Sequence, residues 1–190
     1  VVAKLVANIR QPQMKLVMFF SSKKYDIKEV AQIFKEYLPE IDVVGCTTAG
    51  ELSNQGFTEG SISALSIAAD DFEAAPYLMK EINQKVIFAK DDILHAASTI
   101  GLTPDSGDGF ILTLIDSSQA AEEKILSLLR NNFPKLDIVG GSAADEDFKE
   151  TLVSVNGEAM ENAAAIVFIK TSHEMLFYKE NIYTPTDIQL

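Results

Sequence analysis

The chain has 190 residues, of which 47% are hydrophobic and 23% charged, and its 28 acidic against 16 basic residues give a formal net charge of −12. This composition is that of an ordinary globular domain and excludes a disordered or fibrous chain. The negative field repels phosphate backbones and anionic lipids, so neither nucleic acid nor a membrane surface is expected as a partner.

Cysteine content and hydropathy favour a reducing, aqueous compartment. Cys46 is the single cysteine, so no internal disulfide can form, and we expect a cytoplasmic protein. No apolar run approaches the roughly 20 residues of a membrane-spanning helix. The N-terminus has no signal-peptide pattern, and it opens at Val1 without a methionine, so we expect an excised domain.

The first predicted unit runs strand, helix, strand. The aliphatic run at 16–20 has the length of a fully buried strand. Apolar residues at helical spacing predict a helix over 26–38, which Asp26 and Glu29 begin as a capping box and Pro39 ends. A second buried strand leads into Gly45. The two strands are therefore parallel and joined by a right-handed crossover.

Alternating apolar and small or polar residues then predict hairpin strands at 61–69 and 72–79. A helix follows near 92–100 and is stopped by Gly101. This helix lies in a segment, 81–108, that we expect to link two similar lobes.

The chain repeats itself at an offset of 95 residues. Segment 37–52 aligns without gaps with 132–147, and the two share the residues found at Pro39, Asp42, Val44, Gly45, Ala49 and Glu51. The second copy predicts a strand at 110–115, a helix starting near Ser118, and strands at 151–155, 163–169 and 174–178. Asn156-Gly157 is a strong turn pattern between two of them.

These elements predict an α/β fold of the mixed α+β kind, built from internally duplicated βαβ-plus-hairpin units. The lobes cover about 14–80 and 109–180 and belong to one domain, 1–190. We expect helices to flank mixed sheets. One possible arrangement is two sheets packed face to face in αββα layers.

The motifs give only weak support to phosphate binding, a cysteine nucleophile or a metal site. The spacing from Gly45 to Gly50 is that of a phosphate-binding loop. However, Glu51 occupies the position where such a loop needs a lysine to bind the phosphates. Cys46 has no nearby base, since the chain has only two histidines, and a structural role is favoured. The acidic run 145–147 lacks the spacing of a calcium loop. We therefore expect no catalytic residue, metal or cofactor.

A repeated polar loop at the carboxyl ends of parallel strands remains, and this is where α/β folds place ligands. The alternative, that glycine-rich turns simply connect strands, has about equal weight on physical grounds. The candidate ligand-binding residues are Ser21, Ser22, Cys46, Thr47, Thr48, Gly50, Glu51, Ser117, Ser118, Gly141, Ser142, Asp145 and Glu146.

The phrase at 43–52, Val-Val-Gly-Cys-Thr-Thr-Ala-Gly-Glu-Leu, followed by Ile-Val-Gly-Gly-Ser-Ala-Ala-Asp at 138–145, resembles the N-terminal FIST domain. The resemblance covers roughly 16–178. It implies an intracellular sensory module, in bacteria often joined to a signalling output domain, that binds a small ligand such as an amino acid and carries no chemistry. It also implies a C-terminal FIST half, which this chain does not include.

Two other functions stay open from the sequence. One is a cysteine- or serine-dependent hydrolase or transferase built on the same loops, which a histidine or lysine within reach of Cys46 would favour. The other is a protein-interaction scaffold, which an exposed apolar patch without a concave polar pocket would favour.

Overall fold

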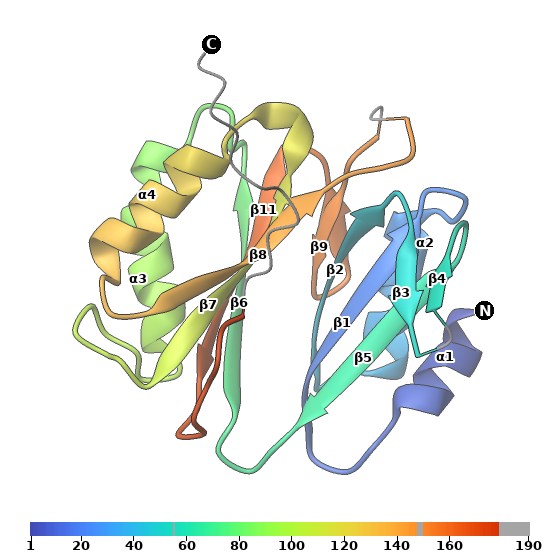
Figure 1. Cartoon of the computed structure of the whole chain (residues 1–190), viewed down its shortest axis with the longest axis horizontal. Coiled ribbons are helices and arrows are strands. Elements are labelled where there is room, and N and C mark those ends of the chain that lie inside the picture. The colour runs from blue at the N-terminus through green and yellow to red at the C-terminus, as the bar shows by residue number, and fades with distance from the viewer. Residues whose placement is uncertain (55, 148–149, 179–190) are drawn as a thin grey trace, which may run out of the picture.

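The structure is a computed structural model that describes residues 1–54, 56–147 and 150–178. It has four layers, in which two sheets pack face to face and helices cover the outer face of each (Figure 1). The predicted mixed α and β class with mixed sheets is confirmed, in the αββα arrangement. No helix in these described ranges is long and apolar enough to cross a membrane.

The first sheet has five strands in the order β10-β9-β2-β1-β5. Only β1 and β2 are parallel, and the helix α2 connects them. The bounds are β1 (Met14–Ser22), α2 (Ile27–Tyr37), β2 (Asp42–Thr48), β5 (Ile62–Ala68), β9 (Val153–Val155) and β10 (Glu158–Met160). The Asp26 side chain accepts hydrogen bonds from the N–H groups of Lys28 and Glu29, which caps α2 as the sequence predicts.

The second sheet has the order β6-β11-β7-β8, and its one parallel pair, β7 and β8, is joined by α4. The bounds are β6 (Glu73–Lys80), β7 (Gly109–Asp116), α4 (Glu122–Asn132), β8 (Asp137–Ala143) and β11 (Ala163–Lys170). The predicted apolar strand at 163–169 is therefore β11, which lies between two neighbours and is buried along seven residues. Outside this sheet lie α3 (Lys90–Ser98) and the short 3₁₀ helix η1 (Val86–Phe88).

The two sheets exchange strands between the predicted lobes. β6 follows the first βαβ unit in sequence but belongs to the second sheet, and β9 and β10 follow the second unit but belong to the first (Figure 1). The sheets therefore do not coincide with lobes 14–80 and 109–180. Elements α2 and α4 lie 95 residues apart, yet Leu16 faces Asp42 whereas Phe110 faces Asp137, a register one residue different. Duplication as the origin of the two units stays a prediction.

Apolar burial holds the layers together. The core between the sheets includes Leu16, Val44, Leu114, Val153 and Val167. Separate cores lie beneath the helices on each outer face. The core on the outer face of the first sheet contains Val2 and Val6 of α1 (Val2–Ile9). We did not predict this helix, although its apolar residues have helical spacing.

The expectation of a strand at 174–178 was wrong. After β11 the chain turns at 171–173, where the Asp71 carboxylate accepts hydrogen bonds from the N–H and hydroxyl of Ser172. Of the following residues, Phe177 packs its ring on Phe110 at 5.6 Å, while Leu176 remains 91% exposed. The alternating pattern suggested a half-buried strand, but the segment gains no strand neighbour.

Candidate functional site

A cavity of about 340 Å³ lies where β1 and β2 end and α2 begins. The carboxyl end of a parallel strand pair, beside a helix N-terminus, is the usual ligand position in α/β folds. Its walls are formed by Lys23, Tyr25, Asp26, Ile27, Lys28, Thr47, Glu150 and Leu152. The volume suits a small molecule.

Thr47 forms the floor of this cavity and joins the two sheets. Its N–H donates to the carbonyl of Leu152 at 3.0 Å, and its hydroxyl oxygen accepts from the N–H of Leu152 at 3.1 Å. Its carbonyl accepts from the N–H of Ala144 at 3.3 Å. Residues 144 and 152 begin and end the connection from β8 in the second sheet to β9 in the first. Thr47 is therefore bonded to both ends of an inter-sheet connection.

The cavity wall carries both signs of charge. Lys23 and Lys28 supply ammonium groups, and Asp26 and Glu150 supply carboxylates. Asp26 is committed to capping α2, whereas Lys28 and Glu150 are exposed side chains at the rim. Lys23 is half-buried and forms an ion pair with the fully buried Asp145 at 3.3 Å. It also pairs with Asp147.

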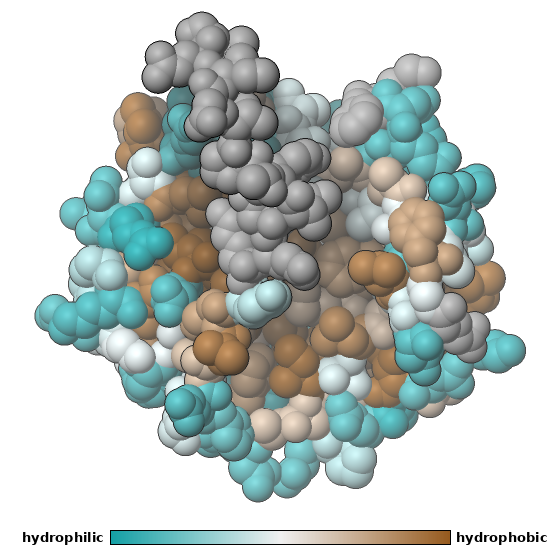
Figure 2. Space-filling view, viewed as in Figure 1, coloured by the Kyte–Doolittle hydropathy of each residue, from teal (hydrophilic) through white to brown (hydrophobic). Residues whose placement is uncertain are grey.

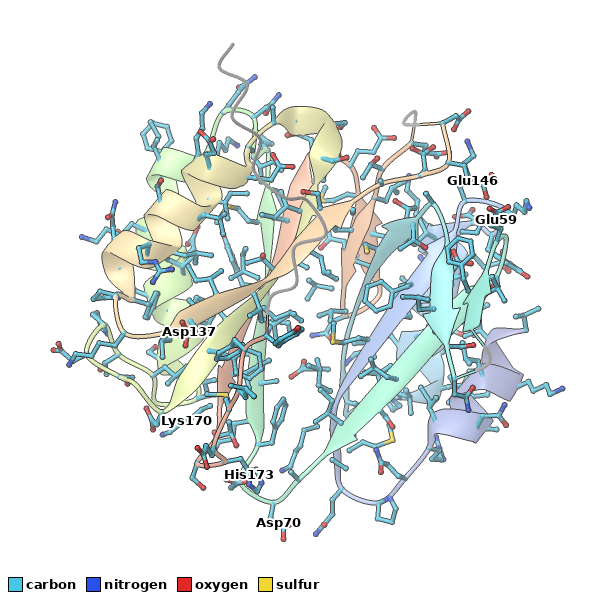
Figure 3. The ribbon with its side chains drawn as sticks, in the orientation of Figure 1. Glu59, Asp70, Asp137, Glu146, Lys170 and His173 are labelled. Carbon is cyan, nitrogen blue, oxygen red and sulfur yellow. The ribbon has the colours of Figure 1, made fainter. Side chains whose placement is uncertain are left out.

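Five predicted residues gather at this end of the first sheet, but only Thr47 lines the cavity. Ser21 and Ser22 are buried at the end of β1, and the Ser22 hydroxyl donates to the Glu146 carboxylate at 3.3 Å. Asp145 accepts from Lys23. The pairs Ser22–Glu146 and Lys23–Asp145 thus tie the end of β1 and the loop after it to the connection after β8. Glu146 is labelled at the upper right of the side-chain view (Figure 3). The Ser21 hydroxyl donates to the carbonyl of Ser22 at 3.1 Å.

Thr48, Gly50 and Glu51 hold a neighbouring hairpin in place and do not line the cavity. The Glu51 carboxylate is 1% exposed and accepts hydrogen bonds from the Thr48 hydroxyl at 2.8 Å and from both the N–H and the hydroxyl of Ser61 at 3.0 and 2.6 Å. These bonds anchor the two-stranded ribbon of β3 (Glu51–Ser53) and β4 (Gly56–Thr58). Gly50 leaves room for the ring of Phe57. The acid that we expected to face a ligand is thus satisfied within the fold.

Ser117, Ser118, Gly141 and Ser142 lie at the carboxyl end of the second sheet. Ser117 and Ser118 form the 3₁₀ helix η2 (Ser117–Gln119), and the N–H and hydroxyl of Ser118 donate to the buried Asp116. Gly141 and Ser142 are exposed on β8, where the Ser142 hydroxyl donates to Glu122 at 2.9 Å. The predicted site residues are therefore distributed over three places and do not form one site.

Cys46 lies in the core between the sheets and is 2% exposed. Burial raises the pKa of its thiol to about 12, so the reactive thiolate is absent near neutral pH. Within the described residues, no histidine or lysine is hydrogen-bonded to it. This placement disfavours a nucleophilic cysteine.

We expect native Cys46 to react with a disulfide reagent such as DTNB at least 100-fold more slowly than in the urea-unfolded chain, because reaction requires both access and a thiolate. The chain has one cysteine, so the absorbance change reports this residue alone. Equal labelling rates in the folded and unfolded states at pH 8 would contradict its burial.

Sequence reasoning missed most of the cavity wall. Lys23, Tyr25 and Lys28 come from the loop after β1 and the first turn of α2, and Glu150 comes from the connection after β8. The loop from a parallel strand to its helix is itself a ligand position, so 22–28 could have been found. Glu150 could not, because only the exchange of strands brings it there.

Comparison with known proteins decides the family. The model of the FIST N domain matches residues 15–190. The chain belongs to the FIST N domain family. Domains of this family generally serve in sensing and signal transduction. The uncharacterized protein MJ1623 of Methanocaldococcus jannaschii is 22% identical over 183 residues, which cover 91% of this chain and 35% of that relative. This chain of the FIST N family therefore spans about a third of that relative's length.

Proposed function

We propose that this FIST N domain is a sensor that binds a small zwitterionic metabolite, such as an amino acid, in the cavity between β1, β2 and α2. The observation that supports this most is a hollow of about 340 Å³ with ammonium and carboxylate groups on its wall, at the carboxyl ends of parallel strands. We further propose that the domain carries no catalysis.

Charge placement suggests how such a ligand would bind. Its carboxylate would meet Lys28 and the positive end of the α2 dipole, and its ammonium group would meet Glu150. A nucleotide fits this proposal poorly, because the hollow lies near the lower limit of ligand sites and the Glu150 carboxylate repels phosphate.

Signalling would arise at the floor of the cavity. Thr47 bonds both ends of the connection between the sheets. A ligand that favours one arrangement of this joint shifts the population toward it, since only differential affinity moves such an equilibrium. A C-terminal FIST half and an output domain are the proposed receivers of that shift.

Calorimetric titration of the purified chain with a panel of amino acids and their deaminated or decarboxylated analogues tests the proposal. Lys28→Ala and Glu150→Gln should each weaken binding about tenfold or more, because each removes a charge-assisted hydrogen bond. The matched controls are Lys90→Ala, at the start of α3, and Glu161→Gln, before β11; both residues are exposed and outside the cavity, so affinity should stay unchanged.

The analogues separate ligand class from site. Weak binding by both the amine-free and the carboxylate-free analogue supports a zwitterion. If the panel stays silent at millimolar concentration, or if Lys28→Ala and Glu150→Gln bind as well as the parent chain, the proposal fails.

A further inference from the structure

An exposed apolar surface lies on the outer helical layer of the second sheet. Ile87 and Phe88 of η1 are 71% and 74% exposed, and Leu126 of the neighbouring helix α4 is 39% exposed. α4 lies on the left of the molecule, whereas β1, β2 and α2, which border the proposed ligand cavity, lie on the right (Figure 1). Clustered exposed apolar side chains of this kind mark interaction sites.

A hollow of about 500 Å³ lies between η1 and α4, and Ile87 is one of its lining residues. It is lined by Val86, Ile87, Glu123, Lys124, Ser127, Leu128 and Asn131. The surface therefore presents both an apolar projection and a receiving hollow. A surface with both features can be complementary to itself across a two-fold axis.

The charges of α4 fit a copy of itself in antiparallel orientation. Glu123, Leu126 and Arg130 are exposed and recur at intervals of three and four residues, so they share one face of the helix. A two-fold axis near Leu126 would place Glu123 of each helix beside Arg130 of the other. The helix dipoles would then also be antiparallel.

We propose that this surface is the contact between two copies of the chain, with α4 packed against α4 and Phe88 of each copy in the hollow of the other. The net charge of −12 opposes self-association elsewhere, whereas here Glu123 would meet Arg130 of the other copy. A second apolar patch, Leu52 and Phe57 on the β3–β4 ribbon, is equally exposed at 74% and 63% and supplies the control.

Sedimentation velocity over a concentration series tests the dimer. The parent chain should show a concentration-dependent monomer–dimer equilibrium, and Phe88→Ser with Leu126→Ser should raise the dimer dissociation constant at least tenfold. The Leu52→Ser, Phe57→Ser control should dimerise like the parent. Circular dichroism of all variants confirms that they are folded.

A charge exchange distinguishes the antiparallel α4–α4 contact from nonspecific association. Glu123→Arg and Arg130→Glu should each weaken the dimer, because each puts like charges together twice, and the double variant should restore it. A monomeric parent at every concentration overturns the proposal. So does a dimer that survives the Phe88 and Leu126 substitutions or that the double charge exchange leaves as weak as the single ones.

Discussion

Replacing Gly45 by alanine is expected to lower the free energy of unfolding by about 1–3 kcal/mol, the usual cost of overpacking a core. A methyl group there would lie 2.4 Å from the nearest ring carbon of Phe19. That ring is fully buried and stacked on Phe34 at a centroid distance of 4.9 Å, so moving it would disturb the core beneath α2. Urea unfolding followed by circular dichroism measures the change.

Gly141→Ala is the matched control, because a methyl group on Gly141 would meet no atom within 4 Å. Its effect should stay within about 0.5 kcal/mol. In a Phe19→Leu background, Gly45→Ala should lower the free energy of unfolding by less, because the ring that the new methyl group would contact is gone. An unchanged cost in that background would show that the Phe19 ring is not the reason for glycine.

Phe34→Ala is expected to lower the free energy of unfolding by about 3–5 kcal/mol, the range for emptying an aromatic core site. Phe34 is fully buried in α2, and its ring joins this helix to the first sheet through Phe19. The same helix is capped by Asp26 and carries Lys28, both on the cavity wall, so ligand affinity should fall as α2 loosens.

Tyr37→Ala serves as the control on the same helix. Its side chain is 48% exposed, so the expected change is below about 1 kcal/mol. Thermal or urea unfolding of both variants gives the comparison. Similar losses for Phe34→Ala and Tyr37→Ala would contradict the packing of α2 described above.

Local patterns were sufficient for the strand–helix–strand units. Asp26 caps α2, Pro39 follows its end, and the Asn156-Gly157 pair turns from β9 to β10 with positive φ at both residues, as the sequence predicts. Pairing between distant segments could not be predicted in the same way. The residues of the turns beside β6 and β9 allow either strand to join either sheet. Which sheet each strand joins depends on the burial of its apolar face between the sheets.

The predicted site and the proposed cavity overlap at the carboxyl end of β2, where Thr47 lines the cavity. That this region binds a ligand stays a prediction. Glu51 and Cys46 had equally suitable chemistry, but one is satisfied by Ser61 and the other faces the core. Spacing along a strand does not tell which side chains are already satisfied by partners from distant loops.

The apolar surfaces of the molecule are unevenly distributed. In the space-filling view, hydrophobic side chains gather in the open front between the two sheets, and polar ones cover the rim (Figure 2). Phe110, where the ring of Phe177 rests, and Leu112 contribute to the core between the sheets. The proposed ligand cavity is distinct from this front and is lined largely by polar groups.

The most direct test is a two-dimensional ¹H–¹⁵N spectrum of the chain, recorded while the tightest amino acid of the panel is added. Our account predicts that the largest amide shifts fall on residues 23–28, Thr47 and 150–152, which surround the cavity. Shifts confined to Thr48, Glu51 and Ser61, or to Ser117, Ser118 and Ser142, with the cavity amides unmoved, would contradict it.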